Sequence, residues 1–160
     1  MNEREFFRVR REAEFPAFIR VLKALPKDRL DYKPHERSPS AGQLVWTLTS
    51  ELRGCVDLAA TGRWDWKPTP PPAFPEMLAA FERHHSDLDA LVARLDDAGW
   101  QRRSQFIVRS AVAMEQPLGD MLWLFLFDAI HHRGQLSTYI RPMGGRVPSI
   151  YGPSGDDPGT

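Results

Sequence analysis

Apolar residues recur at three- and four-residue spacing in four long stretches of the chain, which is the pattern of helices that bury one face. Phe15, Phe18 and Leu22 follow this spacing in the first stretch, as do Leu44 and Leu48 in the second. The four predicted helices cover residues 3–25, 40–59, 75–95 and 117–141. The pattern therefore predicts an all-α fold, an up-and-down-like four-helix bundle.

Capping residues and prolines mark the ends of these helices. Ser40 is suited to cap the second helix, with Gln43 three residues on reaching back as in a capping box. Pro117 suits a first helical turn, and Pro142 disfavours helical geometry in the residue before it, so the fourth helix is expected to end near Arg141.

The segments between the helices are irregular in pattern. Residues 62–75, GRWDWKPTPPPAFP, carry five prolines and two tryptophans, which predicts a long ordered crossing loop between the second and third helices. Residues 102–115 alternate weakly between polar and apolar and favour an extended conformation. The tail after Gly145 reads as a loop, with Val147, Ile150 and Tyr151 expected to fold back onto the bundle.

Length and charge limit the classes of protein that fit. A chain of 160 residues suits one domain, 1–160. It has 21 basic and 21 acidic residues, so no net field favours nucleic acid or an anionic membrane as a partner. Cys55 is the sole cysteine, and the charged start lacks the apolar run of a signal peptide, which together predict a cytoplasmic protein.

Asp128 and His132 lie within the apolar stripe of the fourth predicted helix, one turn apart on the same face. A buried carboxylate is costly without a partner, so Asp128 needs a hydrogen bond, a cation or a metal. One interpretation is an Asp128–His132 hydrogen bond, with Arg133 or another arginine nearby. The other is a pair of metal ligands. Residue types alone favour the first, because two ligands on one helix do not complete a site.

The opposite face of this helix is also apolar. It carries Trp123, Phe127 and Ile130, so the helix is expected either at the centre of the bundle or in a dimer interface. Gly134 lies on the same side, and a glycine within a helix suggests that another backbone approaches closely there.

Three motifs resemble the DinB-like superfamily, also called the DinB/YfiT-like metalloenzymes: HHRGQL at 131–136, VPSIYGPS at 147–154 and RSPSAGQLVWTLTSEL at 37–52. The resemblance implies a four-helix bundle with a long crossing connection, commonly a homodimer. It also implies a divalent metal, often nickel or zinc, held by one histidine of the second helix and two histidines four apart on the last.

Transferred residue by residue, the three ligand positions of the family fall on Thr47, Asp128 and His132, so one histidine of the three is kept. Threonine is a poor ligand, but Glu51 lies one turn beyond Thr47 on the same side of its helix. A Glu51, Asp128, His132 triad would suit manganese, iron or magnesium better than nickel. The competing interpretation is a site that has lost its metal.

Other titratable residues have ordinary structural explanations. His84 and His85 are expected to lie one in solvent and one at the edge of the core, with an inter-helix metal site including His131 and His132 as the alternative. His131 is expected to hydrogen-bond to Gln135 or to another helix. Arg133 and Arg141 suit surface ion pairs, with a carboxylate from the loop after the first helix or an anionic substrate as the alternatives. Cys55 suits the core.

Two function classes follow from the resemblance and the altered ligand set. The first is a metal-dependent enzyme, a thiol S-transferase or hydrolase acting on a small molecule, with Trp46, Phe125 and Tyr139 lining its pocket. The second is a metal-free, dimeric binding or interaction protein that keeps the bundle. Neither class predicts a nucleic-acid or membrane partner.

Overall fold

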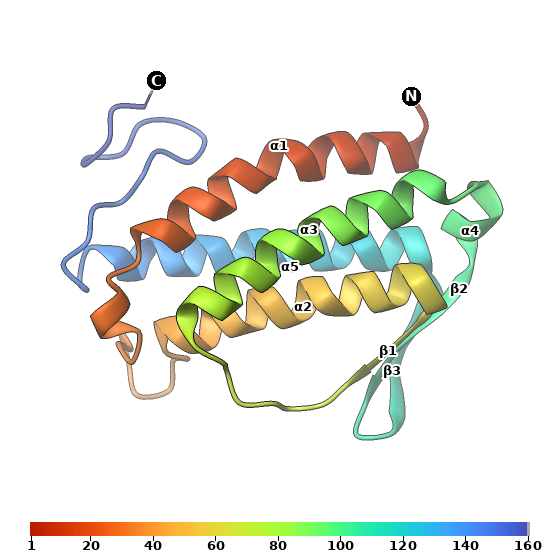
Figure 1. Cartoon of the computed structure of the whole chain (residues 1–160), viewed down its shortest axis with the longest axis horizontal. Helices are drawn as coiled ribbons and strands as arrows, with labels where there is room; N and C mark the ends of the chain where they lie inside the picture. Colours follow the sequence, from red (N-terminus) through yellow and green to blue (C-terminus); the bar gives the residue numbers. More distant parts are fainter. Residues whose placement is uncertain (160) are drawn as a thin grey trace.

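The structure is a computed structural model that describes residues 1–159; Thr160, the last residue of the predicted domain, lies outside the described residues. Its helices are α1 (Glu3–Ala24), the short 3-10 helix η1 (Lys27–Arg29), α2 (Ala41–Thr61), α3 (Phe74–Arg94), α4 (Asp97–Gln101) and α5 (Leu118–Ile140) (Figure 1). Its strands are β1 (Arg63–Trp66), β2 (Arg103–Val108) and β3 (Ala111–Pro117). The four long helices lie where the apolar spacing predicts them.

Local sequence signals account for the ends of α2 and α5. The Ser40 hydroxyl accepts a hydrogen bond from the Gln43 N–H at 3.2 Å, and the Gln43 side chain accepts one from the Ser40 N–H at 2.8 Å, so the predicted capping box is confirmed. Pro117 lies one position before α5 and not in its first turn. Gly62 ends α2 in the left-handed conformation, with φ 78°, and directs the chain into β1.

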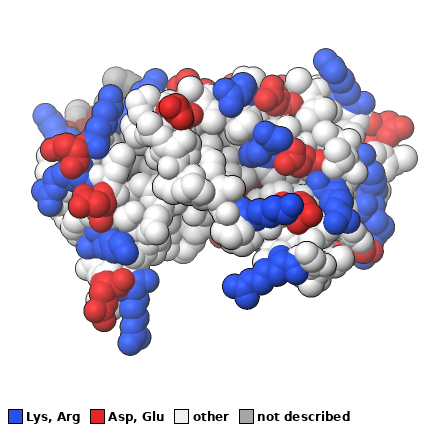
Figure 2. Space-filling view, turned by 60° about the horizontal axis from the view of Figure 1, so that its bottom comes forward, with Lys and Arg blue, Asp and Glu red and all other residues white. Residues whose placement is uncertain are grey.

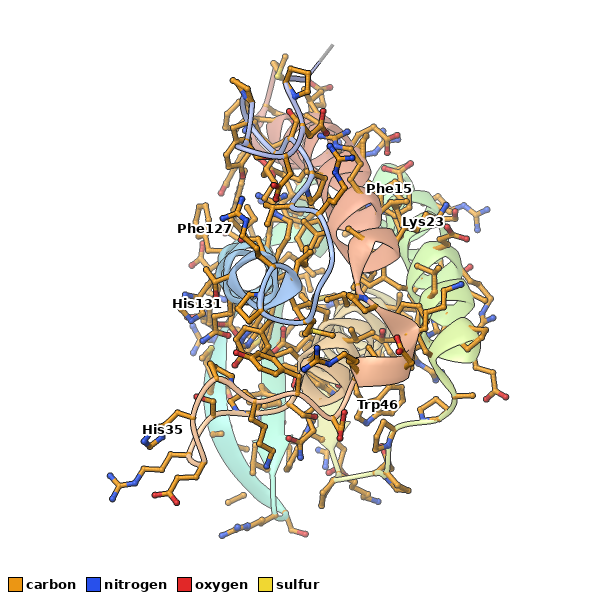
Figure 3. All side chains as sticks on the ribbon, turned by 90° about the vertical axis from the view of Figure 1, so that its left-hand side faces the viewer. Phe15, Lys23, His35, Trp46, Phe127 and His131 are labelled. Atoms are coloured by element: carbon orange, nitrogen blue, oxygen red, sulfur yellow. The ribbon has the colours of Figure 1, made fainter. Side chains whose placement is uncertain are left out.

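The long helices form a bundle in which α1 and α2 occupy one pair of opposite corners and α3 and α5 the other (Figure 3). Both α1 and α2 pack against α3 and α5. Residues 67–73, called the crossing segment below, carry the chain back along the bundle, so α2 and α3 run in the same direction and α1 and α5 in the opposite one (Figure 1). The up-and-down order is therefore wrong, although the long connection between the second and third helices is present.

A three-stranded sheet at one end of the bundle corrects the all-α prediction. β1 pairs in parallel with β2, and β2 pairs with β3 as an antiparallel hairpin. The extended conformation predicted for 102–115 is confirmed, whereas 62–75 is not wholly irregular because its first part forms β1. The hairpin turns through Arg109 and Ser110, which both have positive φ, as a two-residue turn of this kind requires.

Trp64 of β1 attaches the sheet to α2. Its ring lies so close to Gly54 that a Cβ there would be 2.2 Å from ring atoms. It also packs against Phe106 and Phe125, with ring centroids 4.5 Å and 5.1 Å away. Gly54 is thus a glycine at which a neighbouring side chain approaches closely, as Gly119 is against Trp100. At Gly134, where the sequence suggested such an approach, a Cβ would meet nothing within 4 Å.

The C-terminal tail folds back onto the bundle as predicted. Val147 and Ile150 pack against the buried cluster formed by α1, α2, α3 and α5. Tyr151 as a whole residue is 72% exposed, but its hydroxyl donates to the Glu14 carboxylate at 2.7 Å. The tail is therefore held by both apolar and polar contacts.

Charged side chains of both signs are mixed on the face of the molecule that Figure 2 shows. On the face below α2, lysines and arginines are interspersed with acidic residues around a broad uncharged area (Figure 2). Within residues 1–159, none of the helices combines the length and hydropathy needed to cross a bilayer.

Candidate metal centre

Glu51 of α2 and Asp128 and His132 of α5 meet between the two helices. One donor atom from each lies within 4.8 Å of the others. His132 Nε2 is 3.4 Å from Asp128 Oδ2 and 3.7 Å from Glu51 Oε1. This group is called the triad below; because α2 and α5 are neighbours, the i, i+4 pair of α5 faces Glu51 across their interface.

Gln135 orients the imidazole of His132. The Gln135 Oε1 atom lies 2.8 Å from His132 Nδ1 and accepts a hydrogen bond in the tautomer that carries its proton on Nδ1. In that tautomer the Nε2 lone pair faces the two carboxyl groups. A metal-binding histidine requires this tautomer, and Gln135 is in the place of the outer partner that usually fixes it.

Glu51 is the least satisfied member of the triad. Its side chain is 14% exposed, and its Oε2 atom is buried with no hydrogen-bond partner among residues 1–159. Burial, together with the charge of Asp128, raises the pKa of Glu51 to about 9. Asp128 is more open, at 45% exposed, so the triad extends from the interior to the surface.

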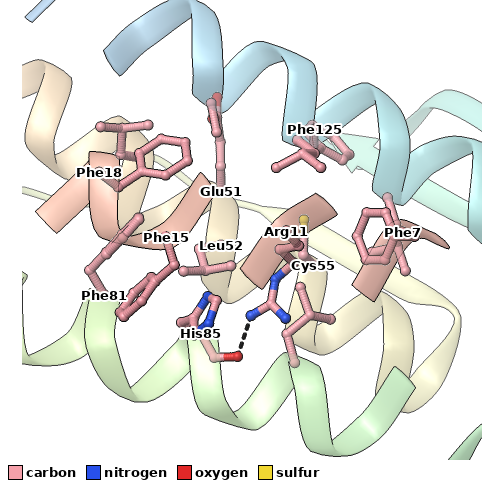
Figure 4. A pocket seen from close by; sticks show the side chains of 15 residues that line it. Phe7, Arg11, Phe15, Phe18, Glu51, Leu52, Cys55, Phe81, His85 and Phe125 are labelled. Carbon is pink, nitrogen blue, oxygen red and sulfur yellow. Dashed lines mark hydrogen bonds between the residues drawn. The ribbon is translucent and has the colours of Figure 1, made fainter. Parts of the chain in front are cut away.

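The inner side of Glu51 faces the core. A narrow cavity of about 40 Å³ lies behind it between the helices, lined mostly by phenylalanine and leucine side chains (Figure 4). Arg11 also lines this cavity and donates to the His85 carbonyl oxygen. The apolar lining accounts for the desolvation of Glu51. A space of this size suits one or a few water-sized groups and is too small for a substrate.

The outer side of the triad opens into a larger hollow of about 480 Å³, called the metal-side hollow below. The walls come from α2, α5, the sheet and the crossing segment, and include Trp46, Glu51, Trp64, Trp66, Phe125 and Asp128. Trp46 and Phe125 thus lie where the sequence analysis expected them. Tyr139 does not: it is buried in the core, with its hydroxyl donating to the Pro39 carbonyl.

Thr47 also lines the metal-side hollow. Its hydroxyl donates to the Gln43 carbonyl at 3.0 Å, so its proton is used within α2 and its oxygen keeps free lone pairs. A ligand role for Thr47 stays a prediction.

The other histidines take no part in the triad. α3 and α5 occupy opposite corners of the bundle, so His84 and His85 do not join His131 and His132 in a four-histidine site. Both His84 and His85 are buried, which corrects the expectation that one faces solvent. His131 is exposed, and Gln135 contacts His132 in its place.

Arg133 is a structural residue of the core. It is 2% exposed, donates to Glu14 at 2.7 Å and also bonds the Tyr151 hydroxyl, so the expected surface ion pair is wrong for this residue. Arg141 does form a surface ion pair, 2.8 Å from Asp156 of the tail. Cys55 is buried as expected, and burial raises its pKa to about 12, which leaves it an unreactive thiol.

The fold and the triad together define a helical-bundle protein with a candidate metal site at a helix–helix interface. Residues 12–136 match the DinB superfamily, and the chain therefore belongs to that superfamily. A relative among known proteins is the uncharacterized protein YrdA of Bacillus subtilis (strain 168), 24% identical over 149 residues that span 91% of this chain and 86% of YrdA.

Solved structures show the same fold at low sequence identity. A DinB-like protein of Bacillus cereus superposes with a TM-score of 0.72 at 20% identity, covering 92% of this chain and 97% of that one. A DinB-like protein of Bacillus subtilis gives 0.67 at 18% identity, covering 86% and 92%. A mycothiol-dependent maleylpyruvate isomerase gives 0.52 at 14% identity, covering 91% of this chain and 62% of the isomerase.

Proposed function

We propose that the triad of Glu51, Asp128 and His132 binds a divalent metal ion, and that the protein is a metal-dependent enzyme acting on a small molecule in the metal-side hollow. The observation that carries the proposal is the buried, unpartnered Oε2 of Glu51 beside a second carboxylate. A buried carboxyl group beside a second carboxyl group is costly to ionise unless a cation lies between them.

The donor set fits a hard or borderline divalent ion. It offers carboxylate oxygens and one imidazole nitrogen, which favours manganese, iron, magnesium or zinc over softer ions. Three protein ligands leave coordination positions open toward the metal-side hollow. When bound, such an ion supplies Lewis-acid activation of a water molecule or a small thiol.

The chain's own residues would supply the rest of the reaction environment. Gln135 holds the His132 ring in its ligand tautomer, and Trp46 and Trp66 offer flat apolar walls against which a small substrate can pack. The class of chemistry, S-transfer or hydrolysis, is supported by the fold that this chain shares with an isomerase that depends on a thiol.

Metal binding can be tested directly with a matched control. Untagged protein, stripped on a chelating resin and titrated with Mn²⁺ or Zn²⁺ in a calorimeter, should bind one ion per chain. His132→Ala should abolish binding, whereas the neighbouring exposed His131→Ala should leave it unchanged. Loss of binding in both variants, or no binding by the unmodified protein, would overturn the proposal.

A second candidate role rests on an apolar surface outside the hollow. Phe6, Val9, Leu124 and Phe127 are between 41% and 61% exposed on the neighbouring helices α1 and α5, and Trp123 links the rings of Phe6 and Phe127. Such a surface favours association, so we propose that a second copy of the chain covers it. Sedimentation should show a dimer, and Phe127→Asp should yield a monomer; a monomeric unmodified protein would refute the dimer.

A further inference from the structure

A second hollow adjoins the metal-side hollow on the other side of the crossing segment. It measures about 470 Å³ and extends between α2, α3 and the crossing segment; it is called the basic hollow below. The two hollows share Trp46, Ser50, Trp64, Trp66, Lys67 and Thr69 as walls. Because these walls are common, the two hollows are adjacent, and one elongated molecule lying across the shared walls would reach both.

The crossing segment is tied down between the two hollows. The indole N–H of Trp46 donates to the Thr69 carbonyl at 2.9 Å, which holds the segment over α2. Trp64 fixes the start of the segment against Gly54. The two hollows are therefore features of a supported backbone and not of a free loop.

The two hollows differ in chemistry. The metal side presents the carboxylates of Glu51 and Asp128, whereas Arg53 and Arg83 line the basic hollow alone; Lys67 is common to both. Two acidic residues also line the basic hollow, Asp65 and Glu76. The Asp65 carboxylate lies 3.9 Å from the Arg63 guanidinium.

The cations of the basic hollow have hydrogen-bonding capacity to spare. Among residues 1–159, neither Lys67 nor Arg83 forms an ion pair or a side-chain hydrogen bond. Arg53 binds Asp57 through Nε at 3.1 Å, which leaves its two terminal nitrogens for another partner. Planar guanidinium groups with free N–H donors recognise carboxylates and phosphates well.

His84 adds a buried, unsatisfied polar group to the same wall. It is 8% exposed, lines the basic hollow, and its Nδ1 atom is buried with no hydrogen-bond partner in the described chain. Burial and the charges of Arg83 and Arg53 lower the pKa of His84, against the opposing charge of Asp87, whose carboxylate lies 3.8 Å from Nδ1. A neutral imidazole can complement an anion by donating one hydrogen bond.

We propose that the basic hollow binds an oxyanion, a carboxylate or a phosphate, carried by the substrate whose reacting group reaches the triad. This inference rests on the proposed metal-dependent function, because the triad defines the reacting end. Arg53 and Arg83 hold the anionic end, Trp46 and Trp66 cover the middle of the molecule, and the reacting group lies at the metal side. The substrate class is therefore a small organic acid or phosphate ester, not a neutral hydrophobic molecule.

The anion site can be tested without knowing the substrate. Inorganic phosphate and succinate are titrated separately into resin-stripped protein at constant ionic strength, while NMR follows the indole N–H signals of Trp46 and Trp66. One of the two anions should cause saturable shifts, and the tighter one identifies phosphate or carboxylate as the preferred group. Failure of both anions to saturate would overturn the inference.

Variants on α3 make the test specific. Arg83→Ala should weaken anion binding about tenfold, which corresponds to ~1.4 kcal/mol. Arg94→Ala removes another exposed arginine of the same helix that does not line the hollow, and it should bind as the unmodified protein does. Equal weakening in both variants would show a general charge effect and refute the site. Lys67→Ala provides a second variant from the crossing segment, with a smaller loss expected.

The two proposals fail separately. His132→Ala should lose metal but keep phosphate or succinate binding, and Arg83→Ala should keep metal. Anion binding without metal binding would support the anion site and refute the proposed metal-dependent enzyme. Metal binding without anion binding would support the metal site at the triad and refute the proposed substrate class.

Discussion

Replacing Glu51 with glutamine should make the metal-free protein more stable at neutral pH. Burial and the charge of Asp128 raise the pKa of Glu51 from 4.5 to about 9. Between these values the folded chain keeps a proton that the unfolded chain has released, so the stability of the metal-free protein falls as pH rises, by ~1.4 kcal/mol per pH unit. At pH 7 this lowers the free energy of unfolding of the metal-free protein by roughly 3 kcal/mol.

Glutamine has the shape of the protonated acid and does not titrate, so Glu51→Gln should remove this cost. Urea denaturation of resin-stripped protein between pH 5 and pH 8 measures it. Unmodified protein and variant should agree near pH 5 and diverge as pH rises. Burial lowers the pKa values of His84 and His85, so these two residues make stability rise with pH below about pH 6.5. Their contribution is the same in the unmodified protein and in the variant.

The difference between the two stability curves therefore isolates Glu51. Glu36→Gln, at an exposed loop position, is the matched control and should follow the unmodified protein throughout. The reasoning is refuted if Glu51→Gln has the same pH dependence as the unmodified protein, because Glu51 would then be solvated or already paired.

Three further outcomes follow from the structure. Gly54→Ala should destabilise the fold by ~1–3 kcal/mol in thermal denaturation, because the added Cβ would overlap Trp64. Gly134→Ala is the control: the space around Gly134 is open, so this variant should be neutral or stabilise the fold by up to ~1 kcal/mol. Arg133→Met should cost ~1.5–3 kcal/mol in urea denaturation, because the buried Glu14 loses its closest ion-pair partner and keeps Arg10 and the Tyr151 hydroxyl; a loss below ~1 kcal/mol would contradict the importance of that pair. Stripping the metal should lower the unfolding midpoint of the loaded protein, and added Mn²⁺ or Zn²⁺ should restore it; an unchanged midpoint would count against a metal bound in the folded state.

The sequence predicts the parts of the fold that depend on local signals. The apolar spacing locates all four long helices, and Ser40 with Gln43 marks the start of α2. The parallel pairing of β1 with β2 joins residues about forty positions apart, Trp64 and Phe106, and a four-residue strand has too few positions to show its period. Helix order in the bundle likewise depends on long-range packing.

Some residues of the candidate site could likewise be predicted from local spacing, and others could not. Asp128 and His132 follow from one-turn spacing within a single helix, whereas Glu51 was reached only by setting the second helix against a family pattern. Trp64 and Trp66 were missed as walls, because the four-residue strand that carries them is too short to be predicted from its pattern. The pairing of Arg133 with a glutamate in α1 has no local signal at all.

Calorimetric titration of a divalent ion in buffers of different ionisation enthalpy tests the central claim most directly. At pH 7 Glu51 is protonated in the metal-free protein and must ionise to become a ligand. One ion should therefore bind per chain with release of about one proton, and Glu51→Gln should lose that release. Binding with no proton released, or no binding at all, would contradict the claim that the buried Glu51 ionises to bind a metal ion.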